Sequence, residues 1–173
     1  MMLIDKYVPE FDYSMANSKQ IHGSKQQILS LLHHVNFDKS WLMRTLFSIR
    51  GVSNQLLTLE KLIEDGLIIL EETGDEIFIG LIGQPWKWNG NVLPMTPDEF
   101  IAFREPNFIK IAMNFYIESL CGDDIQQVIT VTRMYGTNKK AKKMFSRYWM
   151  LISPFSSIIR FEMLRVIKRE LEG

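Results

Sequence analysis

The sequence predicts an α+β fold in which a curved antiparallel β-sheet is wrapped around a long C-terminal α-helix. Two segments support this fold class. The runs 108–120 and 125–135 are long, rich in β-branched and aromatic residues, and joined by a turn sequence, which is typical of a hairpin. The segment 137–172 then repeats apolar residues near the period of a helix. With 173 residues, 46% of them hydrophobic, and no linker-like stretch, the chain is expected to form one domain spanning residues 1–173.

Composition and charge exclude several classes of partner. The chain has 20 Lys and Arg residues and 20 Asp and Glu residues, so its formal net charge is zero and no long-range field attracts nucleic acid. The most apolar long stretch, 144–164, contains Arg147, Arg160 and Glu162, which makes it too polar for a transmembrane segment. The single cysteine, Cys121, rules out an intrachain disulfide framework, and the N-terminus lacks a signal-peptide pattern. We therefore expect a cytoplasmic protein.

The N-terminal part of the chain is expected to contain one strand followed by helices. Alternating apolar residues over 11–23 predict a half-buried strand. Ser24 and Gln27 then fit a capping box at the start of a helix. The apolar face of that helix consists of Ile28, Leu31, Leu32 and Val35. Two further helices are expected, one capped by Asp38 or Ser40 and ending at Gly51, the other capped by Thr58 and ending at Gly66.

The middle of the chain is expected to form a hairpin and a short helix. The runs 67–72 and 76–82 are rich in strand-forming residues and flank a three-residue connection that contains a glycine. The segment 84–94 fits either a short strand with a turn or an irregular loop. Thr96 is expected to cap a helix that Pro106 ends.

The register of the long hairpin follows from its four-residue loop. The expected cross-strand pairs are Ile117 with Val128, Phe115 with Thr130, Met113 with Thr132, and Ile111 with Met134. One face of the hairpin is then apolar apart from a few hydroxyl groups. The final helix, capped by Thr137 and kinked by Pro154, is expected to pack across this face through Phe145, Trp149 and Ile152.

Three segments resemble proteins of the SRPBCC superfamily. They are LIDKYVPEFD at 3–12, TVTR at 130–133 and FSRYWMLISPFS at 145–156. The expected order of elements is also that of the helix-grip fold, which START lipid-transfer domains, polyketide cyclases and pollen-allergen-like proteins share. The resemblance covers essentially the whole chain, looks like an uncharacterised bacterial branch, and implies a helix-grip fold. It carries no activity over to individual residues, because the superfamily has no universal catalytic signature.

The sequence assigns no catalytic, metal or cofactor site. His33 and His34 are adjacent, and neighbouring helical residues point about 100° apart, so they do not face one metal ion. His22 has no Asp, Glu or Cys at a ligand spacing, and no nucleotide-binding or hydrolase motif is present. Cys121 lies in a turn sequence beside two aspartates, which disfavour a thiolate. We therefore expect no catalytic residue, no metal and no cofactor.

The candidate ligand site is the space between the apolar face of the long hairpin and the final helix. Thr130 and Thr132 lie inside this wall, and their hydroxyl groups need partners that water or a ligand supplies, which favours a cavity over a solid core. Trp86 and Trp88 project to one side if their segment is extended, so they either stack on a flat ligand or pack on the core. The candidate residues are Trp86, Trp88, Met113, Phe115, Ile117, Thr130, Thr132, Met134, Phe145 and Trp149.

The sequence leaves three functions open. The first is binding of a small hydrophobic molecule in this cavity without catalysis, which agrees with the apolar lining. The second is an enzyme of the cyclase or aromatase kind, which requires an acid or base that faces the cavity. The third is an interaction module in which aromatic residues between Trp86 and Phe103 dock another protein, or a second copy of the chain in a homodimer.

Overall fold

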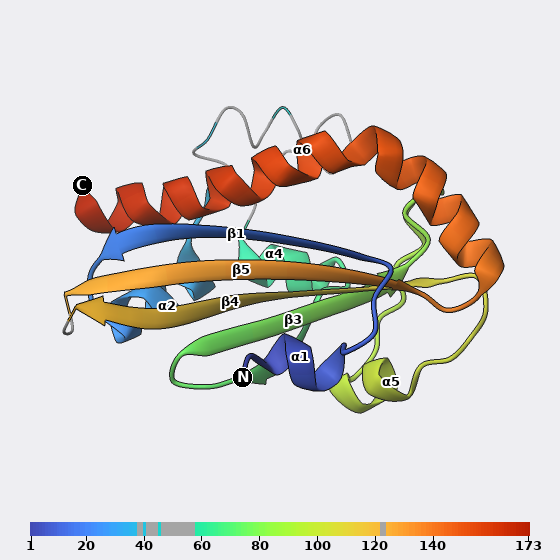
Figure 1. Ribbon diagram of the computed structural model, residues 1–173, viewed down its shortest axis with the longest axis horizontal. Helices are drawn as coiled ribbons and strands as arrows, with labels where there is room; N and C mark the ends of the chain where they lie inside the picture. The colour runs from blue at the N-terminus through green and yellow to red at the C-terminus, as the bar shows by residue number, and fades with distance from the viewer. Residues whose placement is uncertain (38–39, 41–44, 46–57, 122–123) are drawn as a thin grey trace.

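A five-stranded antiparallel sheet and a long C-terminal helix dominate the computed structural model, which describes residues 1–37, 40, 45, 58–121 and 124–173 (Figure 1). The α+β class expected from the sequence is therefore confirmed. The strand order is β1-β5-β4-β3-β2, so β2 to β5 form a meander and β1 closes the sheet beside β5. The strands are β1 Tyr13–His22, β2 Ile68–Glu72, β3 Glu76–Gly83, β4 Ile109–Cys121 and β5 Ile125–Gly136.

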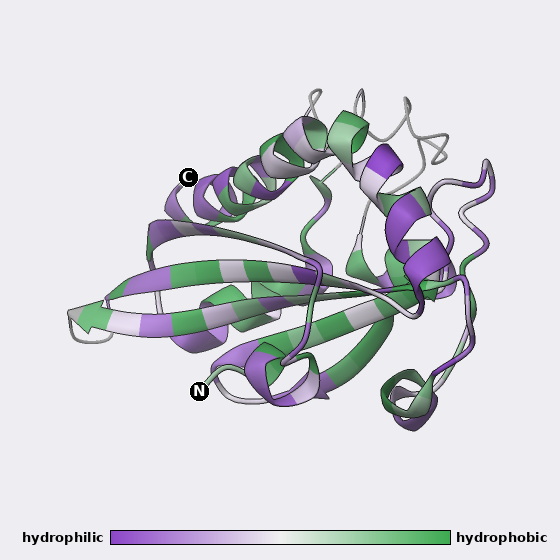
Figure 2. Cartoon of the chain, turned by 45° about the vertical axis from the view of Figure 1, so that its right-hand side comes forward, coloured by the Kyte–Doolittle hydropathy of each residue, from purple (hydrophilic) through white to green (hydrophobic). Residues whose placement is uncertain are grey.

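The register of the β4–β5 hairpin agrees with the sequence expectation. Met113 pairs with Thr132 and Phe115 pairs with Thr130, and the two other expected pairs are also present. The alternation of buried and half-buried residues along β5 places Thr130, Thr132 and Met134 on the same buried face. Hydrophobic and hydrophilic residues accordingly alternate along the long strands in Figure 2.

The helix α6 spans Lys139–Glu172 and lies along β1, above the sheet face that holds Phe115 and Ile117. Its N-cap is Asn138, whose side chain accepts a hydrogen bond from the Ala141 N–H at 2.8 Å, so the expectation that Thr137 caps the helix is wrong. Thr137 instead exchanges hydrogen bonds with the backbone of Phe108.

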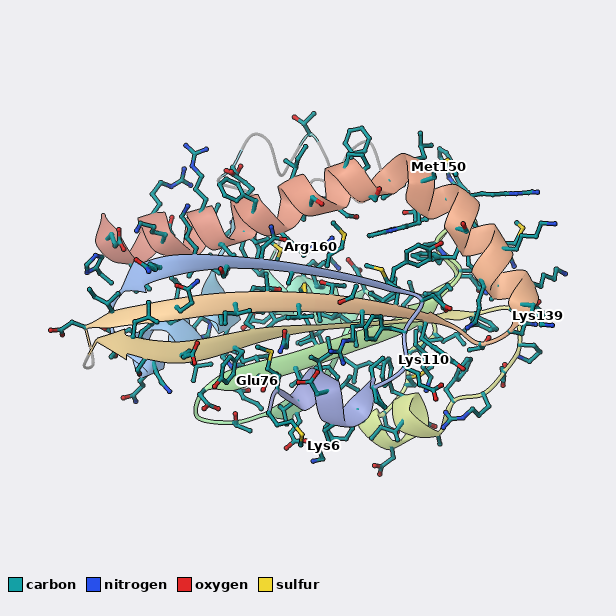
Figure 3. All side chains as sticks on the ribbon, in the orientation of Figure 1. Lys6, Glu76, Lys110, Lys139, Met150 and Arg160 are labelled. Carbon is teal, nitrogen blue, oxygen red and sulfur yellow. The ribbon has the colours of Figure 1, made fainter. Side chains whose placement is uncertain are left out.

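The direction of α6 changes near Met150, which Figure 3 labels at the bend. Pro154 lies four residues further along the helix and has no N–H to donate to the Met150 carbonyl. The expected kink is therefore present, and its cause is the missing hydrogen bond together with the steric demand of the proline ring.

Two shorter helices lie on the same side of the sheet as α6. The helix α2, Lys25–His34, begins with the expected capping box of Ser24 and Gln27 and buries Ile28 and Leu32. The helix α4, Leu59–Glu64, is capped by Thr58 as expected. Gly66 follows it with a φ of +105°, a conformation that glycine adopts without strain. The helix expected between 38 and 51 lies outside the described residues.

The opposite face of the sheet is covered by two helices, one of which the sequence did not predict. This is α1, Leu3–Tyr7, which is held by the carboxylate of Glu76: the Leu3 N–H donates to both of its oxygens at 3.0 and 2.9 Å. The second helix, α5, spans Pro97–Ala102 and has the expected capping box. It ends at Ala102, so the expectation that Pro106 ends it is wrong. The sheet is thus buried on both faces.

The segment between β3 and α5 is a series of turns with one isolated bridge between Ile82 and Leu93. The irregular loop is therefore the correct alternative for 84–94. Within the described part of the chain, no helix combines the length and the hydropathy needed to cross a membrane.

Candidate functional site

An apolar cavity of about 60 Å³ lies between the sheet and the helices α2, α4 and α6. All of its lining side chains are hydrophobic. The lining consists of Leu32, Phe37, Leu59, Leu62, Leu67, Ile77, Ile79, Met113, Phe115 and Met163. A cavity with this lining offers dispersion contacts and no hydrogen-bonding partner, so it favours an apolar occupant over water.

The sheet wall of the cavity follows from the pairing of two strands. Ile77 on β3 pairs with Phe115 on β4, and Ile79 pairs with Met113, so these four side chains form a block on one face. The opposite wall includes Met163 from the second half of α6. Methionine side chains are unbranched and adaptable, so Met113 and Met163 can move to change the shape of the cavity.

A buried cation, Arg160, lies one helical turn before Met163, a residue that lines the cavity. It is 6% exposed and stands between α6 and the sheet (Figure 3). Its Nη1 donates to Thr132 Oγ1 at 3.3 Å, and its Nη2 contacts the sulfur of Met15. In the described part of the chain, no carboxylate pairs with it. Desolvation lowers the pKa of Arg160 to about 10, so the guanidinium stays charged at neutral pH while water no longer solvates it.

Three buried polar atoms in this region have no hydrogen-bond partner. They are Arg160 Nε, Thr130 Oγ1 and Asn17 Oδ1. Asn17 pairs with Thr130 across β1 and β5, and Thr130 pairs with Phe115 across β5 and β4. Residues directly opposite one another in antiparallel strands share a face, so the unpartnered atoms lie on the face that also forms the cavity wall. Buried polar groups without partners are rare and require an explanation.

The structure divides the ten candidate residues into separate groups. Met113 and Phe115 line the cavity, and Ile117 belongs to the same hydrophobic core cluster. Thr130 and Thr132 form the polar region beside Arg160. A second cluster near the start of α6 contains Met134, Phe145, Trp149 and Trp86.

Met134, Phe145 and Trp149 therefore do not face the cavity, contrary to the single wall expected from the sequence. The kink in α6 explains the separation, because the two halves of the helix pack on different parts of the sheet. The first half buries Phe145 against Met134, and the second half places Met163 over Phe115. Trp149 is only half-buried, with its ring stacked on that of Phe145 at 5.6 Å between centroids.

The side chains of Trp86 and Trp88 do not lie on one surface. Trp88 is 99% exposed, whereas Trp86 is partly buried and packs on the cluster around Phe145. The expectation that both rings project to one side required an extended segment, and the turns of 84–94 provide a different geometry.

The adjacent histidines each contact a different glutamate. His33 Nε2 lies 2.9 Å from Glu72 Oε1, and His34 Nδ1 lies 3.9 Å from Glu60 Oε1. The two rings thus interact with separate partners on β2 and α4.

The sequence did not identify Arg160 and Asn17 as site residues, nor eight of the ten side chains that line the cavity, which are Leu32, Phe37, Leu59, Leu62, Leu67, Ile77, Ile79 and Met163. A helical pattern nevertheless predicts the burial of Arg160. Counting in steps of three or four residues, Arg160 falls in the same stripe as the buried residues Ser156, Met163 and Ile167.

Lys110 is a second buried cation, and two of its three N–H donors have backbone acceptors. Its Nζ donates to the carbonyl oxygens of Phe100 at 2.6 Å and of Ile101 at 3.2 Å, near the end of α5. Desolvation, with a smaller contribution from Arg104, lowers the pKa of Lys110 to about 8. Lys110 therefore fixes α5 to the sheet, on the face opposite the cavity.

Comparisons with known proteins do not assign a family. No family model matches the chain, and no curated protein matches it. A crystal structure of a hypothetical protein from Helicobacter pylori resembles it with a TM-score of 0.43 and 10% sequence identity, over 96% of this chain and 93% of that one. A function for this chain must therefore be argued from its own geometry.

Proposed function

We propose that this chain binds a small hydrophobic ligand in the cavity between its sheet and the helices on that face, in a helix-grip arrangement. The observation that supports the proposal is the uniformly apolar lining of a partly enclosed space. Ligand sites in proteins are mostly apolar concavities with a few polar groups that fix orientation. None of the lining side chains is an acid or a base, which supports binding without catalysis over a cyclase-like reaction.

The volume of the cavity limits its occupant. At about 60 Å³ it is smaller than the engineered apolar cavity of roughly 150 Å³ that accepts benzene. A single xenon atom or a short alkyl group is therefore the appropriate occupant of the cavity as it stands. A longer chain enters only when Met113 and Met163 change rotamer, which their flexible side chains allow.

Xenon binding tests the proposal directly. Xenon should shift the backbone amide NMR signals of Ile77, Ile79 and Met113 in a saturable titration. The variant Leu62→Trp should abolish these shifts, because Leu62 lines the cavity from α4. The matched control is Leu70→Trp, which enlarges another half-buried leucine on the opposite face of the sheet.

Both variants must retain a cooperative unfolding transition, since overpacking destabilises a protein by about 1–3 kcal/mol. Wild-type protein without xenon-dependent shifts contradicts the proposal. Equal loss of the shifts in both variants also contradicts it, because the response then does not come from this cavity.

An interaction module is the second candidate function, and the exposure of Trp88 favours it. Trp88 is 99% exposed, which is unusual for a large aromatic side chain. Tryptophan is enriched among the residues that contribute most to protein–protein binding. Sedimentation velocity of wild type and Trp88→Ala tests the homodimer form of this function. A concentration-dependent dimer that the substitution removes would support it, and a monomer at all concentrations would contradict it.

A further inference from the structure

We propose that the hydrophobic ligand carries a carboxylate, which Arg160 binds at the side of the cavity. This inference rests on the proposed function and adds the chemical class of the ligand. A buried charge needs a partner, because a low-dielectric interior cannot replace the hydration that the charge has lost. Arg160 is buried, and in the described residues its hydrogen-bonding partners are one hydroxyl and one thioether sulfur.

The free edge of the guanidinium has the geometry that a carboxylate requires. Nη1 is occupied by Thr132, which leaves the edge formed by Nε and Nη2. Nε has no partner, and Nη2 contacts only the sulfur of Met15, a weak acceptor. Two parallel N–H groups on one edge of arginine match the two oxygens of a carboxylate.

The guanidinium is close to the apolar cavity along both the helix and the sheet. Met163, which lines the cavity, lies one helical turn after Arg160 on α6. Thr132, which accepts the hydrogen bond from Arg160, pairs directly with Met113, another lining residue. Arg160 is not a lining residue, so a ligand that joins the cavity to the guanidinium must pass Met113 or Met163, the side chains whose rotamers change to admit it.

Two further polar atoms complete the chemistry at this end of the site. The hydroxyl of Thr130 is 0% exposed, has no partner, and can donate a hydrogen bond to an anion. Asn17 Oδ1 is a buried acceptor without a partner, so it can accept a hydrogen bond from water or from a hydroxyl group of the ligand. A single cation balances a monoanion, which favours a carboxylate over a phosphate dianion.

A matched pair of ligands tests the inference. Hexanoate and 1-hexanol share an alkyl chain and differ in the charged group, and their binding can be measured by NMR titration. Wild type should bind hexanoate more tightly than hexanol. Arg160→Met should weaken hexanoate binding by about 10- to 100-fold, the effect of losing a charged hydrogen-bonding partner, and should weaken hexanol binding much less, because the hydroxyl group loses only a neutral acceptor's hydrogen bond.

Two other variants make the test specific. Arg147→Met removes the same charge from an exposed position on α6 and should leave hexanoate binding unchanged. Thr130→Val removes the hydroxyl while keeping the shape of the side chain, and it should weaken hexanoate binding by roughly 3- to 10-fold. This variant keeps the test valid if Arg160→Met fails to fold.

The outcomes separate this inference from the proposed function. Xenon binding together with hexanoate affinity no higher than hexanol affinity overturns the inference alone. Equal weakening of hexanoate and hexanol in Arg160→Met also overturns it, because Arg160 then acts only by maintaining the cavity. If xenon does not bind, the proposed cavity function itself is wrong.

Discussion

Arg160→Met is expected to stabilise the ligand-free protein, since it removes a buried charge that has no counter-charge. Burial lowers the pKa of Arg160 to about 10, and this shift corresponds to about 3 kcal/mol of unfavourable free energy. At pH 7 the group is protonated in the folded and unfolded states, so all of this cost is present. It would disappear only as the pH rises well above 10, where the guanidinium loses its proton in both states. Loss of the hydrogen bond to Thr132 offsets about 1–1.5 kcal/mol.

The net gain from Arg160→Met is therefore about 1–2 kcal/mol, or about 2–8 °C in Tm for a chain of this size. Urea unfolding at pH 7, in buffers free of carboxylates, measures it. Lys110→Met is the matched control, because it also removes a buried cation but leaves two carbonyl oxygens without their donor. Lys110→Met removes a similar desolvation cost, but the loss of two hydrogen bonds and the buried carbonyl oxygens left behind offset about 1–3 kcal/mol of it, so the control should gain less than Arg160→Met or nothing. If Arg160→Met is instead destabilised by more than about 1 kcal/mol, Arg160 has a structural role and the reasoning is refuted.

Three further substitutions follow, two that test the packing of the face opposite the cavity and one control in the turn between β2 and β3. Gly80→Ala should lower stability by about 1–3 kcal/mol in thermal unfolding, because the added Cβ would lie 2.7 Å from Leu70 Cδ1. Gly74→Ala, where no atom lies within 4 Å of the added Cβ, should be neutral or slightly stabilising, and equal losses at both glycines would contradict the packing argument. Glu76→Ala should lower stability by about 2–3 kcal/mol and increase hydrogen exchange of the Leu3 amide, which loses its acceptor. Unchanged exchange would show that α1 does not depend on Glu76.

The sheet was predictable because the sequence patterns that indicate it involve residues close together in the chain. Alternating apolar residues define the strands, and the short β4–β5 loop fixes the register that places Phe115 opposite Thr130. The helix α1 was not predictable in this way. It has only five residues, too few for a periodic pattern, and its docking depends on Glu76, 73 positions away from Leu3. A contact between residues so far apart in the sequence cannot be predicted from a local pattern.

The site was predictable only in part. The argument that hydroxyl groups inside an apolar wall need partners identified Thr130 and Thr132 correctly as buried residues. It did not identify Arg160 as the partner of Thr132, because Arg160 lies on α6, 28 residues away, and Thr130 has no partner. The sequence also could not show that Pro154 divides α6 into halves that pack separately, which removed Phe145 from the cavity.

Ser156 and Arg160 of α6 belong to neither of the two apolar clusters that lie under this helix. One cluster contains Met134 and Phe145, and the other contains Phe115 and Met163. The helix buries Ser156 and Arg160, whose polar side chains do not take part in hydrophobic packing. A fully apolar junction would be more stable, since replacing buried ionic groups with hydrophobic residues is often neutral or stabilising. The chain thus carries a polar interruption that costs stability in the empty state, and a ligand with an apolar chain and a carboxylate would compensate that cost.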